Sequence, residues 1–184
     1  MAAVDFTTVE VWTTNGLVTV YLLFVMELAT RPVQFAGSTT SPAETWMRQI
    51  ARNLTDAEDG FLNGKRYMLM DRDAKFSAAY RGILADAGVA PVRLPPRSPN
   101  LNAYQERFMR GLKGECLNRL IFFGETSLRR AVRQFLEHYH SERNHQGLDN
   151  RLINAAGEVG RRVGEVHCRE RLGGVLRYYY RHAA

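Results

Sequence analysis

The sequence predicts an α/β fold with a mixed sheet, and three observations support this expectation. About forty residues at the start have the composition of three strands, the middle of the chain alternates helical and strand patterns, and two long helical segments follow residue 100. Strands joined by tight turns pair antiparallel, whereas strands separated by helices usually join a sheet in parallel. We therefore expect the order β-β-β-α-β-α-β-α-α.

The first three strands are expected to form an antiparallel meander. Val4–Val11 is rich in Val, Thr and Phe, and Asn15-Gly16 is typical of a tight hairpin turn. The apolar run Leu17–Leu28 and a short segment at Pro32–Gly37 supply the other two strands. The run has twelve residues, too few to cross a bilayer, and no basic segment precedes it as in a signal peptide. We therefore expect a soluble, cytoplasmic protein with no membrane partner.

Helices and strands alternate in the next part of the chain. Ser41-Pro42-Ala43-Glu44 matches a capping box with Ser41 as N-cap, which predicts a helix through about Asn53. The elements expected after it are a strand at Tyr67–Met70, a helix at Ser77–Ala87 and a strand at Ala90–Leu94.

The rest of the chain is expected to be helical and then irregular. A proline-rich loop precedes a long helix, about Ala103–Phe122, and a second helix at about Ser127–Ser141. Glycines punctuate the remainder, which predicts a loosely packed tail with a small hairpin around Gly173-Gly174. We therefore expect a core domain over residues 1–150 and a partly ordered C-terminal tail over 151–184.

The positive charge is concentrated in one half of the chain. Residues 1–100 carry ten basic and ten acidic groups, whereas residues 101–184 carry fifteen and nine, so the whole net charge of +6 lies in the second half. Most of the basic groups are arginines, which suit bidentate phosphate contacts. This favours a polyanionic partner such as nucleic acid, with an ordinary solvated surface as the alternative.

Three acids occur where acids are usually unfavourable. Asp5 lies inside the first strand, Asp71 ends the strand at Tyr67–Met70, and Glu106 lies near the start of the long helix. A carboxylate in or beside a core must be protonated, paired or bound to metal. Three of them at one edge of a sheet would form an all-oxygen site suited to two Mg²⁺ or Mn²⁺ ions, which promote phosphodiester chemistry.

Each acid also has an ordinary interpretation. Asp5 could be solvated at a strand edge, Asp71 could open a turn, and Glu106 could favour the positive end of its helix. Spacing alone also leaves open whether Asp71 or Asp73 would reach a metal. The metal hypothesis therefore depends on the three acids occurring together in this order.

Three sequence blocks resemble the signatures of the integrase catalytic core, the retroviral-integrase-like, DDE-type domain of bacterial insertion-sequence transposases. In that family the third acid falls about 35 residues after the second, and here 106 − 71 = 35. Two later segments also resemble the distal helices of the family. The blocks are Val4–Thr7, Met70–Phe76 and Ser98–Phe108, and the later segments are Glu115–Leu120 and His138–Leu148.

The resemblance implies an RNase H-like fold, a five-stranded mixed sheet with three antiparallel strands first and helices on both faces. It implies DNA strand cleavage and strand transfer by Asp5, Asp71 and Glu106 with two Mg²⁺ ions, Mn²⁺ serving as a substitute. The family's second acid stands five residues before Phe76, which selects Asp71 and leaves Asp73 as a neighbour. The family acts as a multimer on paired DNA ends, so a homo-oligomer is expected.

The long helix is expected to carry a DNA-binding face. Glu106, Arg110 and Lys113 recur at i, i+4 and i+7 and share one side, and the resemblance places a DNA-contacting cation at Lys113. Tyr104, Phe108 and Leu112 lie roughly opposite and are expected to pack on the sheet. The alternative is an ordinary Glu–Arg pair on a solvated face.

Two other functions stay open. Only four residues precede Asp5, whereas such transposases usually carry an upstream helix-turn-helix region. A separate polypeptide that binds the DNA ends, or a truncated copy, would account for this start. The alternatives are an RNase H-like nuclease that cuts without joining, and a catalytically inert DNA-binding remnant of a truncated transposase.

Several other side chains are weaker candidates. His138, His140 and His145 have no cysteine at zinc-finger spacing, so helix-surface or phosphate contacts are favoured over metal. Cys116 is expected in the core. Tyr178–Tyr180, flanked by arginines, would either stack on bases or pack as a terminal strand.

Overall fold

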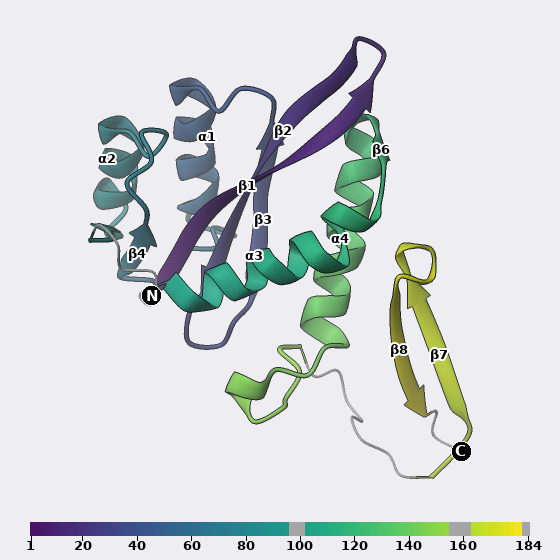
Figure 1. Ribbon diagram of the computed structural model, residues 1–184. Coiled ribbons are helices and arrows are strands. Elements are labelled where there is room, and N and C mark those ends of the chain that lie inside the picture. Colours follow the sequence, from purple (N-terminus) through teal and green to yellow (C-terminus); the bar gives the residue numbers. More distant parts are fainter. Residues whose placement is uncertain (96–101, 155–162, 182–184) are drawn as a thin grey trace. The chain divides into compact units, whose positions relative to one another are not determined.

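Figure 1 shows the computed structural model of the chain, which describes residues 1–95, 102–154 and 163–181. The chain forms two compact units. The first comprises Met1–Glu10 and Asn15–Met109, and the second comprises Val11–Thr14 and Arg110–Ala184. None of the helices in the described ranges is both long and apolar enough to span a membrane.

The first unit is built on a mixed sheet with the strand order β3-β2-β1-β4-β5. Its strands are β1 (Ala2–Thr13), β2 (Gly16–Glu27), β3 (Val33–Thr39), β4 (Tyr67–Met70) and β5 (Ala90–Arg93). The pairing of β2 with β3 is antiparallel, and those of β1 with β4 and of β4 with β5 are parallel. The expected sheet, with the antiparallel strands first, is confirmed.

The hairpin between β1 and β2 has a regular register, which shows which residue of β2 lies opposite Asp5. The backbone N–H of Leu28 donates to the carbonyl of Met1 at 3.0 Å, and the Thr19 hydroxyl donates to the Glu10 carboxylate at 2.7 Å. In both pairs the residue numbers add up to 29, as they do for the two residues that flank the turn. By the same register, Phe24 lies opposite Asp5.

Helices cover both faces of this sheet (Figure 1). The helices α1 (Glu44–Leu54) and α2 (Ala78–Asp86) share a core with side chains from one face, including Val4 and Leu23. On the opposite face, the Phe24 ring lies 5.4 Å from the ring of Phe108 in α3 (Ala103–Glu115). Successive side chains of β2 therefore reach the two helical layers in turn, because side chains alternate along a strand.

The helix starts differ in part from the expectation. The N-cap of α1 is Ala43, without a side-chain cap, so the capping box predicted at Ser41 is wrong. The backbone N–H of Ser41 donates instead to the Thr39 hydroxyl at 3.1 Å, which keeps Ser41 in the turn before the helix. In α2 the hydroxyl of Ser77 accepts from the N–H of Tyr80 at 3.2 Å, a regular N-cap.

The end of α3 lies in the second unit, and the sequence pattern predicts it at the wrong residue. α3 ends at Glu115 rather than near Phe122, and a 3₁₀ turn, Leu117–Arg119, follows it. A short strand, β6 (Phe122–Phe123), then pairs in parallel with Val11 and Trp12 of β1. Aromatic residues favour strands, and the Phe122 side chain is buried in this short strand rather than in a longer helix. α4 (Gly124–Ser141) begins directly afterwards.

The last described segment is a hairpin of β7 (Val166–Arg171) and β8 (Leu176–Arg181). Its turn contains Gly173 and Gly174 at φ values of +65° and +90°, which favour glycine. The N–H of Leu172, at the hairpin turn, donates to the Gln134 side chain of α4 at 2.8 Å. A hairpin is therefore present where the sequence predicts one, whereas residues 155–162 and 182–184 of the expected tail lie outside the described residues.

Candidate active site

Two of the expected acids lie at the same level on neighbouring parallel strands. The register of β1 and β4 pairs Ala2 with Met68 and Ala3 with Leu69. Asp5 lies two residues beyond Ala3, and Asp71 lies two residues beyond Leu69. The ladder therefore brings the backbones of the two acids together where β4 ends.

The third acid is brought to this part of the sheet by α3. The side chain of Gln105 is fully buried, and its amide donates to the carbonyl of Phe24 at 3.2 Å. Phe24 is the strand position opposite Asp5, and Glu106 directly follows Gln105. A buried hydrogen bond thus fixes the helix one residue before Glu106.

The carboxylates themselves point to separate partners. The half-buried Asp5 accepts from the N–H of Phe6 at 2.8 Å, and the exposed Asp71 accepts from the N–H of Asp73 at 2.9 Å, while Glu106 is exposed. Among residues 1–95, 102–154 and 163–181, no three His, Cys, Asp or Glu side chains lie close enough together to hold a metal ion. The structure brings the three elements together without gathering their carboxylates.

Asp73, the neighbour of Asp71, is already engaged. Its carboxylate accepts from the ammonium group of Lys75 at 2.5 Å and from the backbone N–H of Lys75 at 2.9 Å. Partial burial raises the pKa of Asp73, but the hydrogen bonds and charge of Lys75 outweigh burial and hold the pKa below its usual value. The charge of Asp73 is thus paired with that of Lys75, whereas Asp71 is exposed.

Buried oxygen atoms beside the acids lack partners. Thr7 Oγ1, Asn102 Oδ1 and Gln105 Oε1 have no hydrogen-bond partner in the part of the chain that the structure describes. Thr7 shares a strand face with Asp5, and Gln105 precedes Glu106. Buried polar atoms without a hydrogen-bond partner are costly, and these three lie on or next to the elements that carry Asp5 and Glu106. Oxygen ligands are the type that Mg²⁺ and Mn²⁺ take, so the chemistry of these side chains suits such an ion, although the described residues do not gather the three carboxylates into one site.

The loop that carries Asp71 is fixed at its far end by aromatic packing. The Phe76 ring is buried, 5.7 Å from the Phe6 ring and 5.5 Å from the Tyr80 ring. The Lys75 ammonium lies 5.4 Å from the centre of the Phe6 ring. The segment from Asp71 to Phe76 therefore bridges a strand end and the core.

The inward face of α3 differs from the expected one at one position. Phe108 and Leu112 are buried as expected, but Tyr104 is 49% exposed, so its predicted packing on the sheet is wrong. The guanidinium of Arg31 lies 3.5 Å from the centre of the Tyr104 ring. The inward position is taken by Gln105, which a helical stripe with Phe108 and Leu112 could have revealed.

Arg110 and Lys113 are both exposed on α3, at the spacing that places them on the helix side of Glu106. Exposed cations on a helix can contact DNA phosphates, and such contacts fix the position of the protein on the DNA. Their expected role in binding DNA remains a prediction.

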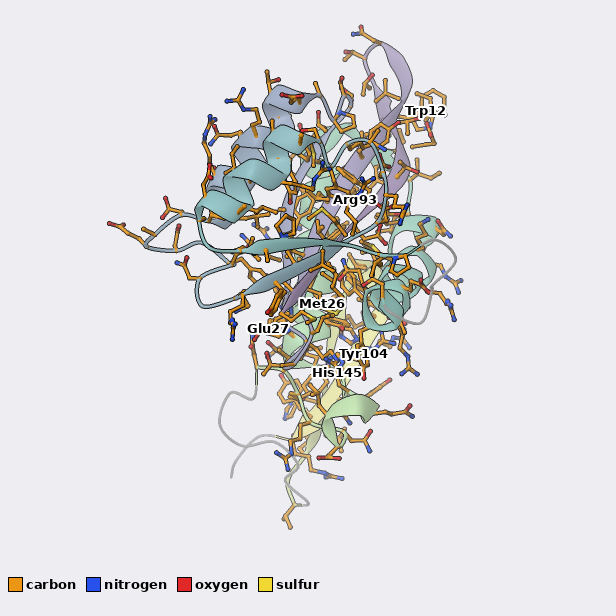
Figure 2. All side chains as sticks on the ribbon, turned by 90° about the vertical axis from the view of Figure 1, so that its left-hand side faces the viewer. Trp12, Met26, Glu27, Arg93, Tyr104 and His145 are labelled. Carbon is orange, nitrogen blue, oxygen red and sulfur yellow. The ribbon has the colours of Figure 1, made fainter. Side chains whose placement is uncertain are left out.

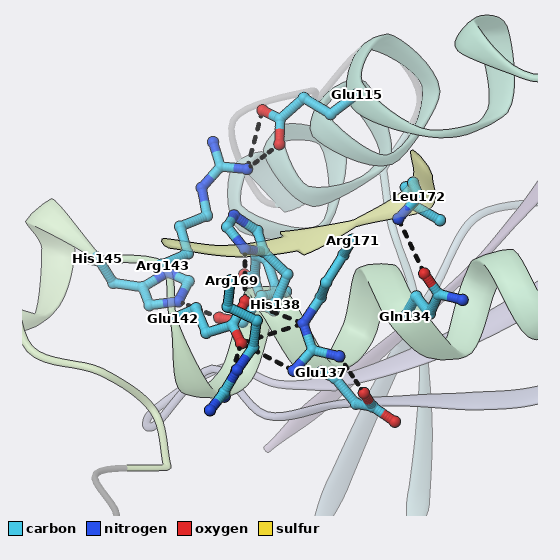
Figure 3. A network of polar contacts seen from close by, with 11 residues as sticks. Glu115, Gln134, Glu137, His138, Glu142, Arg143, His145, Arg169, Arg171 and Leu172 are labelled. Carbon is cyan, nitrogen blue, oxygen red and sulfur yellow. Dashed lines mark hydrogen bonds and ion pairs between the residues drawn. The ribbon is translucent and has the colours of Figure 1, made fainter. Parts of the chain in front are cut away.

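The three histidines lie in the second unit, and Figure 3 shows two of them, His138 and His145. His138 Nδ1 lies 3.0 Å from the Glu142 carboxylate, and His145 Nε2 lies 2.8 Å from the carbonyl oxygen of Tyr139. Burial, and to a lesser extent the charge of His145, lowers the pKa of His140. The Tyr178 and Tyr180 rings stack on each other at 5.7 Å. These side chains take part in packing of the second unit.

Comparisons with known proteins agree with the fold and with the expected resemblance. Residues 87–152 match the integrase core domain family. A chain of the simian T-cell lymphotropic virus intasome, solved in complex with PP2A regulatory subunit B56 gamma, is similar with a TM-score of 0.53 and 11% identity over 97% of this chain and 66% of that one. The catalytic domain of the Mos1 mariner transposase is similar with a TM-score of 0.53 and 12% identity over 73% of this chain and 68% of that one. No curated protein matches the sequence.

The fold is therefore the RNase H-like α/β fold of integrase and transposase catalytic domains. The integrase-core match includes Glu106 and its helix, so the expected resemblance to an integrase core domain is confirmed over residues 87–152. At 11% and 12% identity, the similar structures establish the fold alone.

Proposed function

We propose that this chain is the catalytic domain of a DDE-type transposase or integrase, a polynucleotidyl transferase that cleaves DNA strands and transfers them in a metal-dependent reaction. The observation that supports the proposal is that β1, the end of β4 and α3, the elements that carry Asp5, Asp71 and Glu106, meet at one part of an integrase-like sheet, although the three carboxylates are not gathered there in the described residues. The similar chains come from an intasome and a transposase catalytic domain, which supports DNA as substrate and a homo-oligomer as the working form.

In this proposal Asp5, Asp71 and Glu106 hold two Mg²⁺ ions, for which Mn²⁺ can substitute. When bound, such ions activate water or a 3′-hydroxyl and stabilise the leaving oxygen of a phosphodiester. The chain orients the acids through the N–H groups of Phe6 and Asp73 and through the buried amide of Gln105.

The cations of α3 have a separate task in the proposal. Arg110 and Lys113 bind phosphates of the DNA next to the reacting bond, so that the strand lies along the helix face that carries Glu106. Direct in-line attack requires no covalent bond between protein and DNA, so no Ser or Tyr nucleophile is assigned.

The test uses a branched DNA that mimics the strand-transfer product, because resealing it does not require recognition of a DNA end. The chain is incubated with Mg²⁺ or Mn²⁺ and compared with Asp71→Asn and Glu106→Gln. We expect both variants to lose activity about 100-fold or more, since several kcal/mol of transition-state stabilisation depend on the bound ions. Asp86→Asn and Glu44→Gln, at exposed positions on α2 and α1, serve as matched controls and should keep it.

Two outcomes would assign another function. Nicking of the branch without resealing would indicate an RNase H-like nuclease. A folded protein that binds DNA but is inert with either ion, in line with the ungathered carboxylates, would indicate a DNA-binding remnant.

A further inference from the structure

Two arginines flank the loop that carries Asp71. Arg72 directly follows Asp71, and Arg93 is the last residue of β5, where its register partner is Met70. The N–H of Leu94 donates to the carbonyl of Met70 at 2.9 Å, so the parallel ladder extends to this point. Figure 2 labels Arg93 at the end of β5.

Each arginine is held by the backbone of the other segment. Arg72 Nε donates to the carbonyl of Leu94 at 3.1 Å. Arg93 Nη2 lies 3.5 Å from the carbonyl of Arg72, a longer contact. These contacts use few of the N–H groups of the two guanidinium groups, since each guanidinium carries about five. Both residues are exposed, so the remaining donors face solvent.

The charges of these two arginines are not balanced by nearby acids. Within the described residues, neither guanidinium forms an ion pair with a carboxylate, whereas the nearby Lys75 is paired with Asp73. Backbone carbonyls orient the two groups but carry no full negative charge. Two like charges held at the same end of β4 and β5 repel each other, and a bound anion that reaches both relieves the repulsion.

We propose that Arg72 and Arg93 form a clamp for one phosphodiester group of the DNA strand, beside Asp71. Guanidinium groups match the geometry of phosphate oxygens and bind them bidentately. The choice of DNA rests on the proposed function. The clamp adds to that function a phosphate contact on the β4–β5 edge of the sheet, next to one of the three acids.

The first experiment measures DNA binding without divalent metal, by fluorescence anisotropy of a labelled duplex over a series of NaCl concentrations. We compare the chain with Arg72→Gln, Arg93→Gln and the control Arg48→Gln, an exposed arginine on α1. Loss of one phosphate contact lowers the slope of log affinity against log salt by about 0.9. We expect this decrease in each clamp variant, with the slope of Arg48→Gln unchanged. Unchanged slopes in both clamp variants would overturn the proposal.

A second measurement avoids the folding of variants. Phenylglyoxal modifies arginines in the unaltered chain, and mass spectrometry reports the extent at Arg72, Arg93 and Arg48. We expect DNA to protect the first two and not Arg48. Protection by inorganic phosphate at equal ionic strength, without protection by DNA, would identify a free-phosphate site and contradict the DNA clamp.

These measurements are separate from the test of the proposed function. If the branched DNA is not resealed, but Arg72→Gln and Arg93→Gln still lower the salt slope and DNA still protects both arginines, the clamp is supported and the transferase activity is contradicted. If resealing depends on Asp71 and Glu106, but the arginine variants keep the original salt slope and DNA does not protect the two arginines, the clamp is contradicted and the transferase activity is supported.

Discussion

The two cysteines differ in what their surroundings allow their thiols to do. Cys116 is fully buried after the last turn of α3, as expected of a core residue, and burial raises its pKa to about 12. Cys168 is exposed on β7. Because the thiolate is the reactive form, burial suppresses the chemistry of Cys116 twice, by access and by protonation.

We therefore predict that one thiol of the native chain reacts with Ellman's reagent at mildly alkaline pH. At pH near 8, the thiolate fraction of a thiol with pKa about 12 is on the order of 10³-fold lower than that of an ordinary thiol with pKa about 8.5. Cys168→Ser should abolish the fast reaction and Cys116→Ala should leave it. Two fast thiols in the native protein would contradict the burial of Cys116, and two in denaturant are the control.

At the scale of elements, the buried carboxylate of Glu142, directly after α4, holds the β7–β8 hairpin, together with the hydrogen bond from Leu172 to Gln134 (Figure 3). Glu142 has a side chain that is 1% exposed, and it accepts from Arg171 Nη2 at 2.8 Å and from Arg169 Nη1 at 3.2 Å. Burial raises the pKa of Glu142, but hydrogen bonds from Arg171 and His138 outweigh it and lower the pKa. Glu137 also pairs with Arg171.

We predict that Glu142→Gln releases the hairpin. Removing the Glu142 charge leaves the charges of Arg169 and Arg171 without this buried partner. Since Arg169 is half exposed, we expect the free energy of unfolding to decrease by about 2–3 kcal/mol. Hydrogen exchange of the β7 and β8 amides should accelerate. The control is Glu170→Gln, because the Glu170–Arg177 pair is more than half exposed and should contribute under about 1 kcal/mol. Equal exchange in the two variants would contradict the attachment.

The same network has a defined pH dependence. The folded pKa of Glu142 is lowered, so its contribution is present above the unfolded value of about 4.3 and is lost as pH falls through the folded pKa. In the unaltered chain, hairpin exchange corrected for intrinsic rates should therefore rise only below about pH 4.

Local patterns predict most of the elements, and they fail where distant segments decide. β4 is found at its expected residues because Tyr67–Met70 is a short apolar run after a polar loop. β6 is missed because two residues form a strand only by pairing with β1, a segment far earlier in the chain. Glu142 and Arg171 are 29 residues apart, so no helical or strand spacing connects them.

The candidate site divides in the same way. Asp5, Asp71 and Glu106 are candidates because of the sequence blocks in which they stand, so the local sequence supplies this prediction without the structure. The unpaired oxygen of Gln105 and the position of Arg93 beside the Asp71 loop depend on a tertiary hydrogen bond and on strand register. Neither has a signal in local spacing.

At the scale of the whole molecule, each compact unit buries an acidic group that stays protonated. Tyr80 lies in the first unit, where burial raises the pKa of its phenol, and Cys116 lies in the second. Each group keeps its proton in the folded chain at a pH where the unfolded chain would release it. The stability of both units therefore decreases at alkaline pH, through a different group in each unit.

We predict that the free energy of unfolding in urea falls as pH rises above about 8.5, where the unfolded Cys116 thiol ionises first. The folded pKa is about 12, so one group lowers stability by up to about 1.4 kcal/mol per pH unit in between. Cys116→Ala should flatten the fall between about pH 8.5 and 10, whereas Tyr80→Phe should flatten it only above about pH 10, where an unfolded phenol ionises. Unfolding is followed by tryptophan fluorescence and far-ultraviolet circular dichroism together, since Trp46 lies in the first unit and Trp12 in the second. A fall of the same slope in the unaltered chain and in both variants would show that neither buried group is responsible.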